Sequence, residues 1–302
     1  MLVIVQGKHF DINGTSYIGA PRSNTAMFIT RKIEHLLGVL ESVDGCLVFA
    51  ETGIVASDRL ENKHAFIFSG NPLSEYAKFA KQFEKERFEN ERKFKFNLLH
   101  GGYYQCEDSI VSEDAYIEPG CVIGPDVQIG KNARIFAGCI IRRATIGENF
   151  IANENAVIGS NGFTMAEDEN GNKFRIPTLG RVIIGNNVEI GAHDNISCGT
   201  GGDTVIEDNT KLDALVHLGH DAHLKQNVEI TAGGIIGGFD NLGDHVYVGI
   251  NATLRNRINI GDNAVIGMGS TVTKSVEANI TIAGNPAKLF EKNEQKQDME
   301  VR

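Results

Sequence analysis

The chain has 302 residues, of which 41% are hydrophobic and 23% charged, a composition typical of a soluble globular protein. Its 29 basic and 39 acidic residues leave a net charge of −10, which argues against general nucleic-acid binding and against binding to an anionic membrane surface. The apolar runs are far shorter than the ~20 residues that cross a bilayer, and five scattered cysteines with no recognisable export signal favour a reduced, cytoplasmic protein.

Residues 1–105 contain no repeat and are predicted to form a small α/β domain. Apolar residues on one face predict a helix over 31–43, and a second helix is predicted over 72–90, where a proline suits the first turn. The segments 46–50 and 64–68 are interpreted as short buried strands.

Residues 106–280 carry a six-residue repeat. A period of six is neither the 3.6 of a helix nor the 2 of a strand, and it fits a chain that turns a corner every six residues with an aliphatic side chain pointing inward. Asparagine is frequent three positions later, where it would tolerate the left-handed backbone of a tight corner. Three such sides give a coil of about 18 residues that rises by about one strand spacing. The prediction is therefore a mainly β protein, a triangular solenoid. The longest unbroken run is Ile206, Leu212, Leu218, Leu224, Ile230, Ile236, Leu242, Val248, Leu254, Ile260, Ile266 and Val272.

Two interruptions and a tail depart from the repeat. Residues 159–183 are expected to form a long excursion loop, and four extra residues lie around Gly199–Gly202. Loops that interrupt a rigid scaffold are favoured places for substrate contacts. Residues 281–302 are interpreted as a short C-terminal tail.

Three histidines, His217, His220 and His223, lie within seven residues. Adding one coil of about 18 residues to His220 gives Gly238, which should lie directly beside it. A glycine there would leave an exposed backbone N–H next to an imidazole. That pair suits acyl transfer, because the histidine could take a proton from the nucleophile while the N–H stabilises the developing oxyanion.

One coil further, Arg255 and Arg257 should stack above Gly237 and its neighbours, where guanidinium groups could contact the phosphates of an acyl donor. His193 is a further candidate for contact with the substrate. A role in packing at an interface or on the surface is the simpler alternative for each of these side chains.

The repeat and its corner residues resemble the left-handed β-helix acyltransferases. The left-handed coiling of the chain is taken from this resemblance. Within that group, the chain looks like UDP-3-O-acylglucosamine N-acyltransferase of lipid A biosynthesis, a resemblance that also includes residues 64–83 of a nucleotide-sugar-binding-like N-terminal domain. The matching segments are Ile158–Phe163, Ile176–Val182, Asp203–Ile206 and Lys211–Asp213.

The resemblance implies a homotrimer with sites between subunits, a catalytic His220 and an oxyanion glycine at Gly238. His217 and Asp221 match the His-x-x-His-Asp of the related UDP-N-acetylglucosamine O-acyltransferases, which implies a role at the acceptor substrate. Phe28 is the single aromatic residue in the segment where the family stacks uracil on two.

Departures from the family's pattern favour a different substrate pair. The closing Gly284-Asn285-Pro286-Ala287-Lys288 looks like that of coenzyme A-dependent members, so Lys288 is assigned to the acyl donor. The prediction is an N-acyltransferase that moves an acyl group from acyl-CoA to the amine of a UDP- or dTDP-linked amino sugar, with no bound cofactor. The alternative is the lipid A enzyme itself, with acyl carrier protein as donor.

Two other classes stay open. Some left-handed β-helix trimers are zinc hydratases, but their paired ligands are His-x4-His, a spacing that these histidines lack, so no metal site is predicted. A non-catalytic trimeric scaffold that binds nucleotide sugars is the other alternative.

Overall fold

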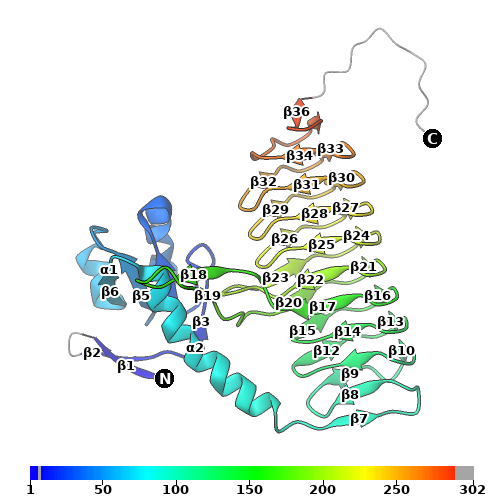
Figure 1. Cartoon of the computed structure of the whole chain (residues 1–302), viewed down its shortest axis with the longest axis horizontal. Coiled ribbons are helices and arrows are strands. Elements are labelled where there is room, and N and C mark those ends of the chain that lie inside the picture. Colours follow the sequence, from blue (N-terminus) through cyan, green and yellow to red (C-terminus); the bar gives the residue numbers. More distant parts are fainter. Residues whose placement is uncertain (6–7, 290–302) are drawn as a thin grey trace.

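The computed structural model describes residues 1–5 and 8–289, in which a column of stacked strands stands beside a smaller N-terminal region (Figure 1). The long helix α2 (Pro72–Glu91) runs from that region towards the base of the column. Among the described residues, no helix combines the length and the apolar character that crossing a membrane requires.

The N-terminal region is built on a four-stranded parallel sheet in the order β3-β4-β5-β6. The side chain of Asn71 accepts a hydrogen bond from the Ser74 amide (3.1 Å) and so caps α2, with Pro72 in the first turn as predicted. The predicted helix over 31–43 forms as a 3-10 segment, η1 (Arg31–Ser42), with Ile33 outside helical geometry. The other elements are β1 (Leu2–Val5), β2 (Lys8–Asp11), β3 (Gly14–Thr15), β4 (Thr25–Ile29), β5 (Leu47–Glu51), α1 (Asp58–Lys63) and β6 (Ala65–Ser69).

The column is a three-sided β-helix, because its strands form three sheets that the chain visits in turn, parallel except for the end pairs β7–β8 and β35–β36. Side A contains β10 (Tyr116–Ile117), β13 (Arg134–Ile135), β16 (Ile151–Ala152), β21 (Glu189–Ile190), β24 (Lys211–Leu212), β27 (Glu229–Ile230), β30 (Tyr247–Val248), β33 (Val265–Ile266), β35 (Thr281–Ala283) and β36 (Lys288–Leu289). Side B contains β7 (Phe96–Leu98), β8 (Tyr104–Cys106), β11 (Val122–Ile123), β14 (Ile140–Ile141), β17 (Val157–Ser160), β22 (Asn195–Ser197), β25 (His217–Leu218), β28 (Ile235–Ile236), β31 (Thr253–Leu254) and β34 (Thr271–Val272). Side C contains β9 (Ile110–Val111), β12 (Val127–Ile129), β15 (Ala144–Ile146), β20 (Val182–Ile184), β23 (Thr204–Ile206), β26 (His223–Leu224), β29 (Asn241–Leu242) and β32 (Asn259–Ile260).

The pairing of the strands confirms the predicted coil. His217 pairs with Ile235, 18 positions further on, and in the two-residue strands from β10 to β34 the second residue points into a continuous buried core. Asparagines occupy the corners with φ near +60°, as expected of a residue that tolerates this conformation. The coil spacing is 17 where Arg134 pairs with Ile151, which explains why the repeat changes phase after Ile135.

The excursion is more ordered than a loop. Its residues form an antiparallel hairpin of β18 (Met165–Glu167) and β19 (Lys173–Arg175), which lies against the N-terminal region (Figure 1). The Asn71 side chain donates to the Glu167 carbonyl (2.8 Å) and ties the two together. At the other end of the chain, β35 pairs with β33 and continues the column, so residues 281–289 do not form a separate tail.

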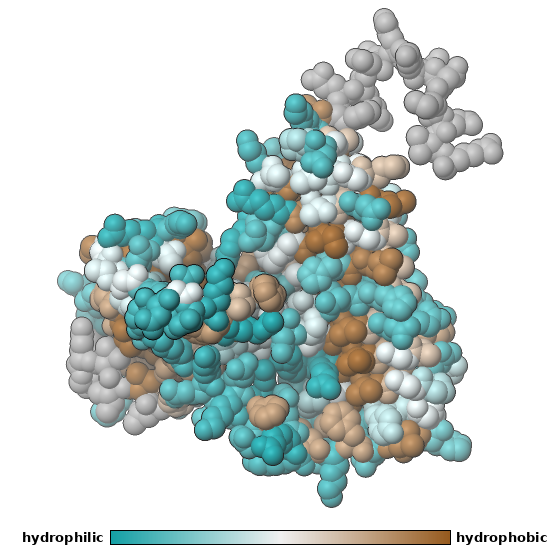
Figure 2. Space-filling view, in the orientation of Figure 1, coloured by the Kyte–Doolittle hydropathy of each residue, from teal (hydrophilic) through white to brown (hydrophobic). Residues whose placement is uncertain are grey.

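The outward-facing residues of side B are apolar over part of the column, and Figure 2 shows hydrophobic surface along the middle of the column. The exposed apolar side chains on this side include Tyr104, Ile140 and Ile235.

Candidate active site

His220 and Asp221 occupy one corner of the β-helix, between β25 and β26. Leu218 is fully buried, and the chain turns after it. Asp221 has a left-handed backbone (φ 58°), which aspartate tolerates better than most residues. The turn places Nδ1 of His220 2.8 Å from Oδ2 of Asp221, the geometry of a base and the carboxylate that orients it.

The Asp221 carboxylate is held by a loop that consists of the four extra residues, Gly199–Gly202, and the following Asp203. This segment, residues 199–203, is named here the glycine loop. Its Oδ2 accepts hydrogen bonds from the amide (2.8 Å) and the hydroxyl (2.7 Å) of Thr200, and its Oδ1 accepts one from the Gly202 amide (2.8 Å). Burial opposes ionisation, but hydrogen bonds from His220 and Thr200 outweigh it and lower the pKa of Asp221. The carboxylate is therefore both ionised and fixed in position.

In the neutral imidazole with its proton on Nδ1, the ring donates to this carboxylate and Nε2 keeps its lone pair. The hydroxyl of Thr164, just before the hairpin, lies 2.9 Å from Nε2 and would be the donor to that tautomer. Thr164 thus marks the position where an N–H or O–H group of a substrate could approach the base.

Gly238 lies beside His220, as the coil spacing predicts. A Cβ on Gly238 would stand 2.8 Å from both Cε1 and Nε2 of His220, so glycine is required there for the ring to keep its position. Among the hydrogen bonds of residues 1–5 and 8–289, none uses the Gly238 amide. The structure therefore places Gly238 beside the imidazole, while their catalytic roles stay predictions.

The side chain of Asp240 stabilises the turn that carries the Gly238 amide. Its buried carboxylate accepts hydrogen bonds from the Gly237 amide (3.0 Å) and the Ile258 amide (3.0 Å). Burial raises the pKa of Asp240 to about 7. Phe239, with φ 64°, packs edge-on against the His220 ring at 5.1 Å between centroids.

A cavity of about 430 Å³ opens onto His220 and Gly238. His217 lines it as well. The pKa of His217 is lowered, mainly because the ring is buried and to a smaller extent because charge on the neighbouring His220 opposes its protonation. The excursion that contains the β18–β19 hairpin supplies one wall of this cavity. There the guanidinium carbon of Arg175 lies 4.9 Å from the centroid of the Phe163 ring. The remaining lining residues are Asn161, Asn195, Ser197, Gly219 and Asn256.

On the other side of Asp221, a second cavity of about 660 Å³ separates the N-terminal region from side C and is named here the domain cleft. Arg257 projects into it and lies over the Phe239 ring at 3.9 Å. Arg22 and His35 line the cleft from the N-terminal region. The cleft therefore gathers cationic and histidine side chains on both walls.

The histidines and arginines singled out in the sequence do not all converge. His223 points into the domain cleft, where its Nε2 lies 2.6 Å from a Glu207 oxygen, so the three clustered histidines face different surroundings. Arg255 has its Nη1 3.4 Å from the Thr273 carbonyl and lines neither cavity.

Three other expected site residues lie apart from His220. Phe28 packs inside the N-terminal region against Tyr76, with ring centroids 5.3 Å apart. His193 is an exposed corner residue with φ 60°. Lys288 lies on β36, the last strand of the column, and is exposed (Figure 1). None of the three lines either cavity.

The sequence analysis missed Thr164, Phe239 and Asp240 as parts of the site. Thr164 is 56 positions from His220 and reaches it only through the excursion, so no spacing could have found it. Asp240 could have been identified from the sequence, because it is 18 positions after the inward-facing Ala222. A carboxylate at such a buried position indicates a structural or functional role.

Comparison with known proteins supports this architecture. The family model described as bacterial transferase hexapeptide (six repeats) matches residues 241–274, and the model described as GMPPB C-terminal domain matches residues 105–200. The structure of LpxA from Acinetobacter baumannii covers 64% of this chain and 74% of that chain, with a TM-score of 0.58 and 26% identity. The left-handed β-helix fold is thus confirmed.

Sequence relatives point the same way. UDP-3-O-acylglucosamine N-acyltransferase 2 of Legionella pneumophila (strain Lens) is 49% identical over 146 residues, which is 48% of this chain and 42% of the relative. The UDP-3-O-acylglucosamine N-acyltransferase of Hydrogenovibrio crunogenus is 39% identical over 112 residues, 37% of this chain and 32% of the relative. The predicted resemblance to the hexapeptide-repeat acyltransferases is thus confirmed. The matched segments span less than half the length of these curated acyltransferases.

Proposed function

We propose that the chain is an N-acyltransferase that moves an acyl group from a thioester to the amine of UDP-3-O-acylglucosamine. The observation that carries this proposal is the His220 ring, with Nδ1 2.8 Å from the Asp221 carboxylate, directly beside Gly238. The names of the relatives favour this acceptor over the more general UDP- or dTDP-linked amino sugar.

The proposed reaction begins with attack of the neutral amine nitrogen on the thioester carbonyl carbon. Nε2 of His220 accepts a proton from that nitrogen, and the Gly238 N–H donates to the carbonyl oxygen as it becomes negative. The C–S bond then breaks, the thiolate takes the proton from His220, and an amide and a free thiol leave. The ionised Asp221 stabilises the imidazolium that forms between these steps.

The domain cleft suits the diphosphate and uridine of the acceptor. Arg257 supplies a guanidinium group, and guanidinium groups bind phosphate through two parallel hydrogen bonds. Arg257 was first assigned to the acyl donor, but its place in the cleft, away from the cavity at Gly238, favours the acceptor. The cleft and the His220 cavity meet at the His220–Asp221 pair, so an acceptor bound in the cleft could present its amine to the base.

The donor is proposed to be a thioester of a phosphopantetheine thiol, which is the chemistry that acyl-CoA and acyl carrier protein share. The homotrimer and the cytoplasmic location stay predictions. The apolar outward residues of side B support a trimer, because exposed apolar patches of this kind commonly mark contact surfaces between subunits.

A thiol-release assay tests the function. UDP-3-O-acylglucosamine, UDP-glucosamine and dTDP-linked amino sugars serve as acceptors with either an acyl-CoA or an acyl carrier protein thioester, and UDP-N-acetylglucosamine serves as an acceptor that offers only hydroxyls. Thiol release that requires an amine acceptor and is lost in His220→Ala supports the proposal. Release with the hydroxyl acceptor alone, or no release with any pair, overturns it.

A further inference from the structure

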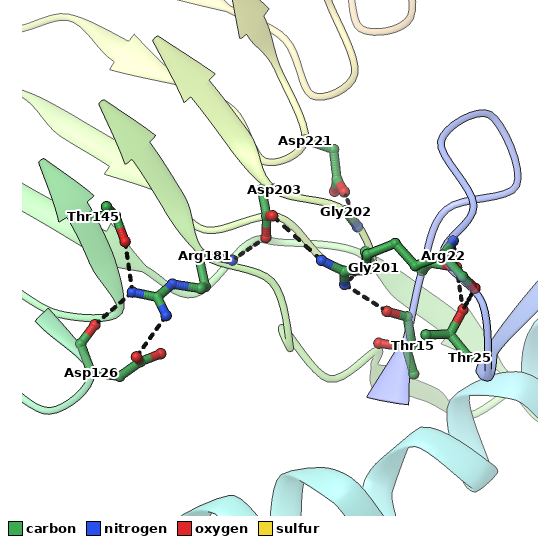
Figure 3. Close-up of polar contacts among 11 residues, drawn as sticks. Thr15, Arg22, Thr25, Asp126, Thr145, Arg181, Gly201, Gly202, Asp203 and Asp221 are labelled. Carbon is green, nitrogen blue, oxygen red and sulfur yellow. Dashed lines mark hydrogen bonds and ion pairs between the residues drawn. The ribbon is translucent and has the colours of Figure 1, made fainter. Parts of the chain in front are cut away.

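The N-terminal region contacts the glycine loop that holds Asp221, through Arg22 (Figure 3). Nη2 of Arg22 donates to the Gly201 carbonyl (3.2 Å) and to the Thr15 carbonyl (2.9 Å). Nη1 of the same guanidinium lies 3.4 Å from Oδ2 of Asp203. One side chain therefore joins both regions of the molecule.

The glycine loop fills a narrow space between the N-terminal region and Asp221. A Cβ on Gly201 would lie 3.0 Å from the Ser16 backbone, and a Cβ on Gly199 would lie 3.0 Å from Oδ1 of Asp221. The loop is in contact on both faces, so a displacement of one face is passed to the other.

The loop's other anchor lies on the column. Oδ1 of Asp203 accepts a hydrogen bond from the Arg181 backbone amide (2.9 Å). The Arg181 guanidinium in turn donates hydrogen bonds to Asp126 (2.7 Å) and to Thr145 (3.0 Å) (Figure 3). Asp203 is therefore fixed to side C through Arg181. Arg22 supplies the matching restraint from the N-terminal region.

We propose that Arg22 is a positioning residue for the general base. It holds the glycine loop so that the Thr200 and Gly202 amides fix the Asp221 carboxylate, which in turn orients the His220 ring. The N-terminal region also reaches the base without Arg22, because the Tyr17 ring packs on Phe239 (4.8 Å) and Phe239 packs edge-on against His220. The expected effect of Arg22 on kcat rests on the proposed function. The expected effect of Arg22 on the order of the glycine loop rests on geometry alone.

The structural consequence is tested by hydrogen exchange, which needs no activity. In Arg22→Ala, the amides of Thr200 and Gly202 should exchange faster than in the wild type by about tenfold, because the loop that carries them loses the Arg22 restraint and their bonds to Asp221 open more often. The control is Arg59→Ala, which removes an arginine of the same region whose ion pair with Glu41 (3.3 Å) does not reach the column. Unchanged exchange in Arg22→Ala, or the same change in Arg59→Ala, overturns the proposal.

The catalytic consequence is tested by a double-mutant cycle of Arg22→Ala with Asp221→Asn. Arg22→Ala alone should lower kcat by roughly 10- to 100-fold, because small displacements of a catalytic group cost up to ~10²-fold. In the Asp221→Asn background the same change should cost less than about threefold, because its route to His220 is already cut. Additive losses in kcat would contradict a route through Asp221, and a loss confined to KM for the acceptor would assign Arg22 to binding instead.

The two proposals can fail separately. A wild-type chain that releases no thiol overturns the proposed function, while the exchange measurement still decides whether Arg22 holds the loop. Melting temperatures check that the variants fold, and Arg22→Lys should fall between wild type and alanine because one ammonium group cannot bind both regions in the same geometry.

Discussion

Replacing Gly238 by alanine tests the central geometry of the site. The added methyl group would lie 2.8 Å from Cε1 and Nε2 of His220 and 3.2 Å from Cδ2, and these three ring atoms are its nearest neighbours. Gly238 does not have a positive φ, so alanine fits the backbone and the conflict is with the imidazole alone.

The size of the effect follows from these distances. Ordinary carbon contacts begin near 3.4 Å, so the ring would have to retreat by roughly 0.6 Å, which stretches its 2.8 Å bond to Asp221 and its 2.9 Å contact with Thr164. We expect kcat to fall by about 10- to 100-fold from the displaced base, and further where the methyl group hinders the oxyanion.

The assay is thiol release at saturating acceptor, with Gly70→Ala as the control because a Cβ there meets no atom within 4 Å. His220→Ala combined with Gly238→Ala removes the ring that the methyl group strikes, so the double variant should be little slower than His220→Ala alone. A Gly238→Ala enzyme within about threefold of the wild-type rate would refute the proposed role of this pair.

Three further outcomes are expected. Asp221→Asn should lower kcat by roughly 10²–10⁴-fold at every pH where the wild type is active, because an amide can no longer enforce the proton on Nδ1 of His220; a kcat profile that matches the wild type would contradict this. Arg257→Ala should raise KM for a UDP-linked acceptor by about tenfold and leave kcat nearly unchanged, whereas an altered KM for the thioester would return Arg257 to the donor. Burial raises the pKa of Asp194 and of Asp240 to about 7, so the folded state binds more protons than the unfolded state between about pH 4 and 7 and these groups make stability fall as pH rises through that window. The melting temperature measured from pH 4.5 to 8 should therefore depend less on pH in the Asp194→Asn/Asp240→Asn variant; an unchanged slope would show that the two carboxyls are not responsible.

The fold could be predicted because its signal is local and repeated. Each inward aliphatic residue and each corner asparagine obeys the same steric rule, so the period alone yields the coil, and the coil alone yields the contact of His220 with Gly238. The helix over 72–90 followed from proline and apolar spacing in the same way. Such features need no information about distant parts of the chain.

The rest of the site depends on contacts between segments that no period relates. Thr164 reaches His220 through a hairpin whose position is set by the N-terminal region, and Arg22 reaches the glycine loop across 179 positions of sequence. Phe28, chosen by resemblance, is half-buried and packs against Tyr76 at the edge of the core of the N-terminal region, so its role at the acceptor stays a prediction. Tertiary packing, and not spacing, decides these positions.

The pairing of strands 18 positions apart around the candidate site, from β25 to β34, has a consequence for how such a protein can change length. A whole extra turn added above β34 would make the molecule taller by about 4.8 Å and leave the distance between His220 and Gly238 unaltered. A single residue inserted into one of the strands between those two positions would instead turn that strand's inward side chain to the surface, unless a corner absorbs the extra residue, as the corner after β22 absorbs the glycine loop. Growth by complete turns is therefore compatible with a fixed reaction centre, whereas a smaller insertion is compatible only where it bulges out at a corner.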